Sequence, residues 1–273
     1  MRALAATALL ATAAFNATAA QDRYPRAAAA YAVVVDGRLV WARALDTPRA
    51  PASLAKLLSA LVLLDEHVDP AAIVTVNRIA ASTIGTRAGL RTGEALTFGD
   101  ALTAMLVSSA NDACLALVYH VAPDVATFVA RMNKRASELG MAASHFLQPC
   151  GLDVDGQQTT ARDLLRLAGA AIAAPEIAAR AQLEHASIGT VSGRRIELAA
   201  SNLLLGREAG VLGLKSGFTN RAGKCLIAFA QRGEHRVWLV LLDAPDRWWL
   251  AAGLLDEAFK LAEAGMDLPA IAP

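Results

Sequence analysis

The chain has 273 residues, with 26 Lys and Arg against 25 Asp and Glu, so its formal net charge is +1. This near balance creates no overall field that would attract nucleic acid or an anionic membrane, and we expect neither as a partner. Three cysteines, Cys114, Cys150 and Cys225, permit at most one intramolecular disulfide, and their spacing is not that of a metal site. We therefore expect neither a metal ion nor another cofactor.

The N-terminal segment has the pattern of an export signal. Arg2 supplies a positive start, residues 3–15 are apolar, and residues 17–20 are small. The apolar stretch is too short to cross a bilayer, which needs about 20 apolar residues. We expect residues 1–20 to be removed on export, which leaves residues 21–273 as a single domain with no transmembrane anchor, periplasmic or secreted.

The mature chain opens with two short apolar runs, at residues 31–35 and 39–42, on either side of Asp36-Gly37. An Asp-Gly pair between two such runs is a strong signal for a tight β-hairpin. Residues 53–67 are apolar at nearly every position, which predicts a helix that is buried on all sides. We expect this helix to run through the middle of the protein.

The next hundred residues are predicted to be helical. Thr97 with Asp100, and Thr160 with Asp163, have the spacing of a capping box at a helix N-terminus. Gly140 is expected to end the helix before it. Two sets of apolar residues repeat at helical spacing, namely Val125, Phe128, Val129, Met132, Ala136 and Leu139, and then Leu164, Leu165, Ala168, Ala171 and Ile172.

The pattern changes from about residue 185. Residues 211–216, 226–230 and 237–242 have the composition of strands joined by glycine-containing turns, and a last helix is expected at about 250–264. Strands at both ends with helices between them predict an α/β protein of the α+β kind. Its antiparallel five-stranded sheet would be built from both termini and flanked by helices, with a helical insertion at about 59–180.

Ser53 and Lys56 are the first pair of residues that could do chemistry. Hydrolysis of an amide needs a nucleophile and a group that takes its proton. Residues three apart lie on one face of a helix, so the Lys56 amine can reach the Ser53 hydroxyl. Burial and a second cation nearby would lower the lysine pKa and let it act as a base. A Ser-x-x-Lys motif is expected by chance about once in a chain of this size, so this pair alone does not establish a catalytic site.

Two further motifs follow it. Ser109-Ala110-Asn111 lies at the junction of two predicted helices, where a hydroxyl and an amide can project together into a cleft, although a plain helix cap is the competing interpretation. Lys215-Ser216-Gly217 lies on a predicted strand, and the absence of a side chain at Gly217 would let a substrate backbone approach closely. The start of an ordinary turn is the competing interpretation there.

In this order, the three motifs resemble those of the penicillin-binding DD-peptidases, a family that includes low-molecular-mass D-alanyl-D-alanine carboxypeptidases and endopeptidases. The sequences around them match as well, at residues 51–57, 109–113, 160–164 and 213–219. The resemblance extends from about Ala28 to Phe259. It implies a β-lactamase/transpeptidase-like fold and a serine hydrolase that cuts D-alanyl peptide bonds in peptidoglycan.

The resemblance also implies a role for each catalytic residue. Ser53 would be the nucleophile that forms an acyl-enzyme, and Lys56 its general base. Ser109 and Asn111 would form the proton relay and the contact to the substrate amide. The partners implied are a stem peptide that ends in D-Ala-D-Ala, or a cross-linked peptide, and β-lactam inhibitors that acylate Ser53.

The third motif would bind the substrate. The resemblance implies that Lys215 and Ser216 attract and bind the carboxylate of the peptide, in the segment that continues through Gly217, Phe218 and Thr219. The backbone N–H groups of the nucleophile and of Phe218 would form the oxyanion hole. Arg247 is a further candidate for a carboxylate contact, although a surface arginine is the interpretation that the sequence favours.

Two features depart from the commonest family pattern. Ser216 replaces a threonine, which keeps the hydroxyl. Only about fifty residues follow Lys215, so we expect neither the second β-rich domain nor the membrane-binding helix of many carboxypeptidases. Residues 218–220 and 223–226 resemble the shorter DD-endopeptidases. The resemblance therefore leaves carboxypeptidase and endopeptidase activity open.

A β-lactamase is the main rival among enzymes, because it shares the three motifs. In the commonest serine type, a glutamate between the second and third motifs activates the water that releases the acyl group. None of the glutamates in that interval stands in a Glu-x-x-Leu-Asn context; they are Glu138, Glu176, Glu184, Glu197 and Glu208. We expect penicillin to acylate Ser53 and to leave slowly.

Three other classes are less well supported. A Ser-His-Asp hydrolase lacks a Gly-x-Ser-x-Gly elbow and a histidine in a supporting context among His67, His120, His145, His185 and His235. A metallopeptidase lacks His-Glu-x-x-His. A non-catalytic peptidoglycan-binding module would be expected to lose the nucleophile or its lysine, and both are present.

The cysteines allow one structural expectation. Cys114 lies three residues after Asn111 on a predicted helix, and Cys225 lies on a strand expected to neighbour that of Lys215. A bridge or thiol pair between Cys114 and Cys225, behind the active site, is therefore a possible arrangement. At least one cysteine is expected to remain a buried free thiol.

Overall fold

A computed structural model describes residues 22–265 of the chain. The predicted export signal at residues 1–20 lies outside the described residues. Within them, no single helix is long and apolar enough to span a membrane. The helices at Asn111–Val121 and Val125–Glu138 pass that test together, but they are bent by 92° relative to each other.

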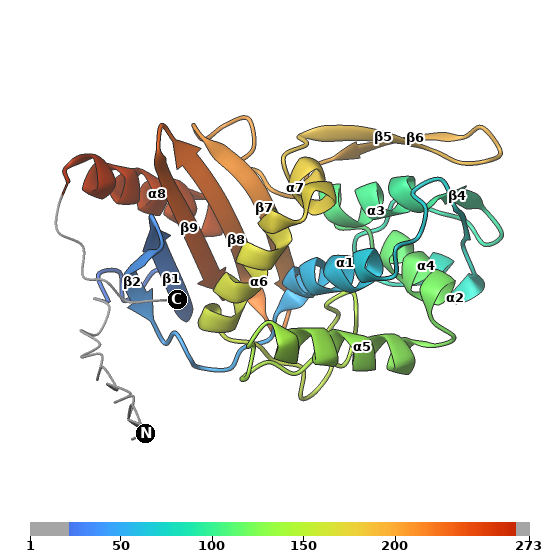
Figure 1. Cartoon of the computed structure of the whole chain (residues 1–273), viewed down its shortest axis with the longest axis horizontal. Helices are drawn as coiled ribbons and strands as arrows, with labels where there is room; N and C mark the ends of the chain where they lie inside the picture. Colours follow the sequence, from blue (N-terminus) through green and yellow to red (C-terminus); the bar gives the residue numbers. More distant parts are fainter. Residues whose placement is uncertain (1–21, 266–273) are drawn as a thin grey trace, which may run out of the picture.

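A five-stranded antiparallel sheet forms one half of the molecule (Figure 1). Its strands are β1 (Ala30–Val35), β2 (Arg38–Arg43), β7 (Val211–Thr219), β8 (Gly223–Arg232) and β9 (His235–Leu242), in the spatial order β2-β1-β9-β8-β7. Asp36 and Gly37 both have positive φ, 48° and 80°, as the predicted tight hairpin requires. Since β1 pairs with β9, an early and a late segment of the described chain meet in the sheet, and the predicted fold class is confirmed.

Both faces of this sheet are covered. Successive side chains in a strand point to opposite faces, so each strand contributes to two hydrophobic cores. In β8, Ile227 and Phe229 belong to the core shared with the helices of the insertion, whereas Leu226 and Ala228 belong to the core beneath α8 (Arg247–Glu263). Two further helices, α1 (Ala55–Asp65) and α6 (Ala161–Ala173), pack in the first of these cores. Every residue of α1 from position 55 to 63 is buried, as its continuous apolar sequence predicted.

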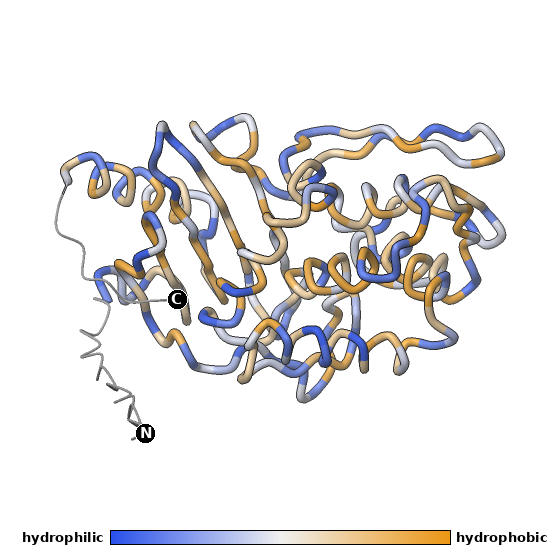
Figure 2. Tube along the Cα trace, viewed as in Figure 1, coloured by the Kyte–Doolittle hydropathy of each residue, from blue (hydrophilic) through white to orange (hydrophobic). Residues whose placement is uncertain are grey.

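The insertion is mainly helical. Its other helices are η1 (Ala52–Leu54), α2 (Arg78–Ala81), α3 (Phe98–Val107), α4 (Asn111–Val121), α5 (Val125–Glu138) and α7 (Pro175–Ala181). The predicted starts of α3 and α6 are confirmed, because Thr97 Oγ1 and Thr160 Oγ1 accept hydrogen bonds from the N–H groups of Asp100 and Asp163 at 3.0 and 3.1 Å. Gly140 follows α5 with φ +73°, and Figure 2 shows hydrophobic and hydrophilic residues alternating along this helix.

Two small hairpins were not predicted. They are formed by β3 (Ile73–Thr75) with β4 (Ala95–Thr97) and by β5 (His185–Gly189) with β6 (Arg195–Ala199). The prediction of a wholly helical stretch is wrong at β3 and β4, because three residues are too few for a period-two pattern to be recognised. In β5 and β6 most side chains are exposed or half-buried, so their sequences lack the apolar run of a core strand.

The cysteine pairing differs from the expectation. Cys114, in α4, is bonded to Cys150 with a Cα–Cα distance of 6.0 Å, and Cys225 is free and buried in β8. The segment after α5 returns beside α4 and brings Cys150 to Cys114, whereas the Cys225 thiol donates to the Ala222 carbonyl at 3.5 Å. The suggested pair of Cys114 with Cys225 is therefore wrong, and the expectation of one buried free thiol is confirmed.

Replacing both Cys114 and Cys150 by serine should lower the free energy of unfolding by about 3–4 kcal/mol, because the bridge restricts the unfolded chain over a sequence separation of 36. Urea denaturation without reductant measures the change. Cys225→Ala, which leaves the bridge intact, is the matched control. Dithiothreitol should still lower the urea midpoint of this variant, as it does for the wild type. If dithiothreitol lowers the midpoint of the double variant as much as that of the wild type, the bridge is not the source of the stability.

Candidate active site

Ser53 lies in the single turn of η1, and Lys56 follows in the first turn of α1. The two helices are continuous, so the lysine amine lies one turn from the serine hydroxyl, with 3.1 Å between Nζ and Oγ. This is the contact that the Ser-x-x-Lys spacing predicted.

Lys56 is fully buried and has two other partners. Its Nζ donates to Asn111 Oδ1 at 2.6 Å and to the Cys150 carbonyl at 2.5 Å. Both partners are acceptors, and Ser53 Oγ is a third polar atom within hydrogen-bonding distance of Nζ. In its neutral form the amine has a lone pair that can accept the hydroxyl proton of Ser53. Burial, with the nearby charge of Lys215, holds the pKa of Lys56 well below its usual value. The arrangement can therefore take a proton from Ser53.

The second motif joins α3 to α4. Asn111 is the first residue of α4, and its Nδ2 donates to the Ile84 carbonyl at 2.7 Å, which fixes the amide oxygen toward Lys56. Ser109 is buried, and its backbone has φ +64°. Within residues 22–265 its hydroxyl makes no hydrogen bond to the other motif residues, so the structure joins Asn111 to Lys56 directly but not Ser109.

The third motif lies on β7, at the edge of the sheet. Lys215 is 1% exposed, and its Nζ donates to the Ser216 carbonyl at 2.9 Å and to Ser201 Oγ at 3.4 Å. Burial and then the charge of Arg247 lower the pKa of Lys215 to about 7. The Ser216 hydroxyl donates to the Ser201 carbonyl at 2.8 Å. Ser201 was not predicted from the sequence, because no motif or periodic pattern marks it.

Gly217 brings β7 against the nucleophile. A Cβ atom on Gly217 would lie 2.8 Å from the Ser53 nitrogen and 2.9 Å from Ala52 Cβ, so a side chain there would force the strand away from η1. Phe218 follows and is 58% exposed. Thr219 Oγ1 accepts from the Ala222 N–H at 3.0 Å and so stabilises the turn to β8.

Arg247 is not the surface arginine that the sequence favoured. It is half-buried at the start of α8, where it donates to the carbonyl of Gly217 and, at 3.3 Å, to that of Cys225. Burial lowers its pKa. Arg247 thus binds the backbones of β7 and β8, and its predicted contact to a substrate carboxylate stays a prediction.

Asp112 is a second residue that the sequence did not single out. It is fully buried and accepts hydrogen bonds from the N–H groups of Ala88, Gly89 and Leu90 at 3.0, 2.9 and 3.0 Å. Its charge also acts to raise the pKa of Lys56, against the larger effects of burial and Lys215. Asp112 therefore holds the segment 84–90 against the start of α4, beside Asn111.

The rival chemistries lack support at this site. None of the hydrogen bonds of Ser53 or Lys56 within the described residues involves a histidine or a glutamate. No group of three or more His, Cys, Asp or Glu residues between positions 22 and 265 is arranged to hold a metal ion.

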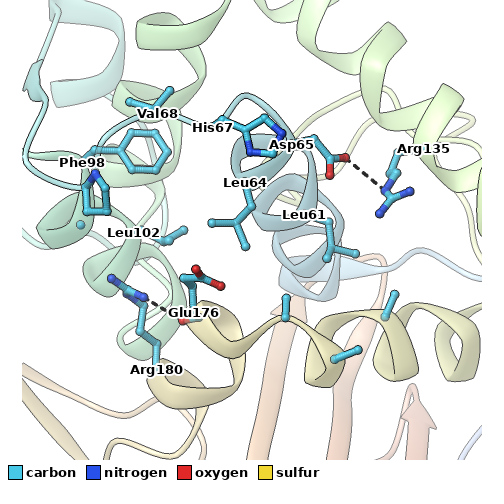
Figure 3. A pocket seen from close by; sticks show the side chains of 15 residues that line it. Leu61, Leu64, Asp65, His67, Val68, Phe98, Leu102, Arg135, Glu176 and Arg180 are labelled. Atoms are coloured by element: carbon cyan, nitrogen blue, oxygen red, sulfur yellow. Dashed lines mark hydrogen bonds and ion pairs between the residues drawn. The ribbon is translucent and has the colours of Figure 1, made fainter.

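A hollow of about 650 Å³ lies near the other end of α1, away from Ser53 (Figure 3). Leu61, Leu64 and Phe98 line its apolar wall, and Asp65 pairs with Arg135 at 3.2 Å on its rim. None of the residues of the three motifs lines this hollow. The candidate active site is therefore the region around Lys56 and Lys215, and not this hollow.

The family model for D-alanyl-D-alanine carboxypeptidases matches residues 16–246 of the chain. The chain belongs to this family. The family assignment agrees with the resemblance inferred from the three motifs. It does not by itself assign a role to any single residue.

Individual relatives agree with this assignment. A D-alanyl-D-alanine carboxypeptidase of Mycobacterium tuberculosis is 31% identical over 82% of this chain and 79% of its own length. A D-alanyl-D-alanine endopeptidase of Escherichia coli is 31% identical over 84% of this chain and 76% of its own. A carboxypeptidase of Bacillus subtilis is 29% identical over 83% of this chain, but the chain spans only 60% of its length.

Solved structures agree on the fold. The Streptomyces K15 DD-transpeptidase aligns with 86% of this chain and 98% of its own, with a TM-score of 0.82 and 25% identity. A carboxypeptidase from M. tuberculosis aligns with 90% of this chain and 94% of its own, with a TM-score of 0.81 and 29% identity.

Lys215→Met should weaken the pH dependence of stability above neutrality. The pKa of Lys215 is about 7 in the folded state and 10.5 for an ordinary lysine, which represents the unfolded state. Between these pH values the unfolded chain therefore binds one more proton than the folded chain. The free energy of unfolding of the wild type therefore rises there, by about 1.4 kcal/mol per pH unit for this proton. Urea denaturation at pH 7, 8 and 9 compares the two proteins. Equal slopes would show that Lys215 is not the group that titrates.

Asp112→Asn should loosen the segment 84–90 and cost about 1–3 kcal/mol of stability, because an amide offers one acceptor where the carboxylate offers two. Hydrogen exchange of the Ala88, Gly89 and Leu90 amides should become faster than in the wild type. Asp69→Asn, at an exposed turn, is the control and should leave these amides unchanged. Unaltered protection in the Asp112 variant would contradict the anchoring role.

Proposed function

We propose that the chain is a serine DD-peptidase that acts as a D-alanyl-D-alanine carboxypeptidase on peptidoglycan stem peptides. The observation that carries the proposal is the contact set of Lys56, a buried amine that lies between two carbonyl acceptors and 3.1 Å from Ser53 Oγ. Membership of the family supports it. In this proposal residues 21–273 form the single catalytic domain, with a helical subdomain at about 59–180, and the protein is exported to the periplasm or secreted.

Acylation begins when Ser53 gives its hydroxyl proton to neutral Lys56. The serine oxygen attacks the carbonyl carbon of the penultimate D-alanine, and the bond to the terminal D-alanine nitrogen breaks. Ser109 relays the proton that Lys56 took from Ser53 to this nitrogen, so that Lys56 becomes neutral again and the terminal residue leaves as an amino acid. The backbone N–H groups of Ser53 and Phe218 stabilise the negative oxygen in between, and water then releases the acyl group.

The edge position of β7 supports the binding step. An edge strand has unpaired N–H and C=O groups to which an extended peptide can add as a further strand. Gly217 keeps this edge close to the nucleophile, since any side chain there would collide with η1. Lys215 and Ser216 attract and bind the terminal carboxylate, and Asn111 contacts the substrate amide.

A DD-endopeptidase that cuts peptidoglycan cross-links is the second candidate. Residues 218–220 and 223–226 resemble the shorter DD-endopeptidases, and this resemblance favours it. An E. coli endopeptidase and an M. tuberculosis carboxypeptidase are equally similar to the chain, at 31% identity. Both activities use the same acyl-enzyme and differ in the leaving group. A β-lactamase and a non-catalytic peptidoglycan-binding module are further alternatives, which the same experiment distinguishes.

Benzylpenicillin should form a stable adduct on Ser53, since no glutamate among residues 22–265 forms a hydrogen bond with Ser53 or Lys56. Mass spectrometry of the intact protein should detect the added penicilloyl group in the wild type and in Ser137→Ala, an exposed control on α5, but not in Ser53→Ala. Rapid loss of the adduct with release of hydrolysed penicillin would instead indicate a β-lactamase.

Purified muropeptides complete this test. Loss of one D-alanine from monomers establishes a carboxypeptidase, and conversion of dimers to monomers establishes an endopeptidase. A folded protein that forms no adduct and cleaves neither substrate would contradict the proposal and favour the binding module.

A further inference from the structure

An exposed tryptophan at the start of α8 stands between two hollows. Trp249 is 81% exposed, the largest such fraction among the large apolar side chains that are exposed in residues 22–265. On one side lies a hollow of about 360 Å³, lined by Leu203, Arg207 and Trp248 among others. On the other side lies a hollow of about 490 Å³ that reaches along α8. Trp249 and Asp246 line both, so the two hollows share a wall.

None of the residues of the three motifs lines these hollows, but α8 is linked to the strand of the third motif. Arg247, between Asp246 and Trp248 in the chain, donates to the Gly217 carbonyl on β7. The guanidinium also lies over the Trp248 ring, 4.4 Å from its centroid, which fixes that ring. We call Asp246, Trp248 and Trp249 the tryptophan platform. Arg247 connects this platform to the strand that carries Lys215.

The polar groups of the platform are free to accept hydrogen bonds. Asp246 is the N-cap residue of α8, yet its side chain makes no capping hydrogen bond. Within the described residues, neither Asp246 nor Glu208 has a hydrogen bond or ion pair from its carboxylate. Ligand sites combine apolar and aromatic walls with a few such polar groups. The platform therefore offers a stacking surface with two unpartnered acceptors beside it.

The charges around the hollows are balanced. Of the acidic lining residues, Glu257 and Asp256 pair with Arg23 and Arg232 at 3.1 and 2.7 Å, which leaves Glu208 and Asp246 against Arg207 and Lys260. This balance creates no net field that would attract a strongly charged lipid or nucleic acid. It suits an uncharged ligand whose hydroxyl or amide groups donate to carboxylates and whose C–H groups pack on an aromatic face.

We propose that the tryptophan platform binds the glycan strand to which the stem peptide is attached, a polymer of N-acetylated amino sugars. The inference rests on the proposed function, because the scissile peptide then reaches β7 while its sugar lies on α8. Two adjoining hollows on either side of Trp249 suit consecutive sugar rings of a polymer, with hydroxyls donating to Asp246 and Glu208. The platform would thus favour glycan-linked peptides over free ones.

Binding of the soluble β-1,4-linked tetramer of N-acetylglucosamine tests the platform by itself. Isothermal titration calorimetry should detect binding to the wild type, at least tenfold weaker binding to Trp249→Ala, and a smaller loss in Trp249→Phe. Val191→Ala, which shortens an exposed side chain on the β5–β6 hairpin, is the control and should bind as the wild type does. Absence of binding to the wild type would overturn the proposal.

Activity gives a second readout that separates this inference from the proposed function. Trp249→Ala should hydrolyse a free stem peptide as the wild type does, while its KM for glycan-linked peptide rises about tenfold. Equal KM values on the linked substrate would overturn the platform's role. If neither protein cleaves the free peptide, the proposed function fails, and the tetramer still tests the platform. If the wild type is a dimer and Trp249→Ala converts it to a monomer, the platform is an interface with a second copy of the chain. That result would overturn the proposal of glycan binding.

Discussion

The charge state of one buried amine constrains the rest of the candidate site. Lys56 lies out of water, where an ammonium group is costly, and two carbonyl acceptors fix the position of its amine. Each acceptor comes from a different part of the chain, Asn111 from α4 and Cys150 from the segment after α5. Segments far apart in sequence must therefore be in place before the amine is held beside Ser53.

The second buried lysine adds to this constraint. Lys215 lies close enough to Lys56 for its charge to lower the pKa of Lys56, and Arg247 does the same to Lys215. Three basic groups thus succeed one another from the start of α8 to the start of α1. Asp112 is the buried carboxylate that opposes them. Hydrogen bonds from backbone N–H groups stabilise its carboxylate. Asp112 can therefore order the segment 88–90 without forming an ion pair with either lysine.

Local patterns were enough to predict much of this arrangement. The Asp36-Gly37 turn, the largely apolar α1 and the capping threonines of α3 and α6 each depend on neighbours in the sequence, and each was predicted correctly. The contact between Ser53 and Lys56 is likewise one helical turn. Ser201, Asp112 and the partner of Cys114 depend on segments that meet only in three dimensions, and no periodicity reports such meetings. Arg247 was misjudged for the same reason, since charge alone favoured the surface.

The pairing of β1 with β9 has a consequence for how the chain folds. Ala30 lies opposite Leu242, so the centre of the sheet joins residues from opposite ends of the described chain. Contacts of such long sequence separation slow folding, because the loop between them must close before they contribute free energy. The helices of the insertion depend on nearer neighbours and can form earlier. The strand that carries Lys215 then gains its place beside Ser53 late, when β8 and β9 have been synthesised and paired with β1, so the nucleophile stays without its complete surroundings until the sheet closes.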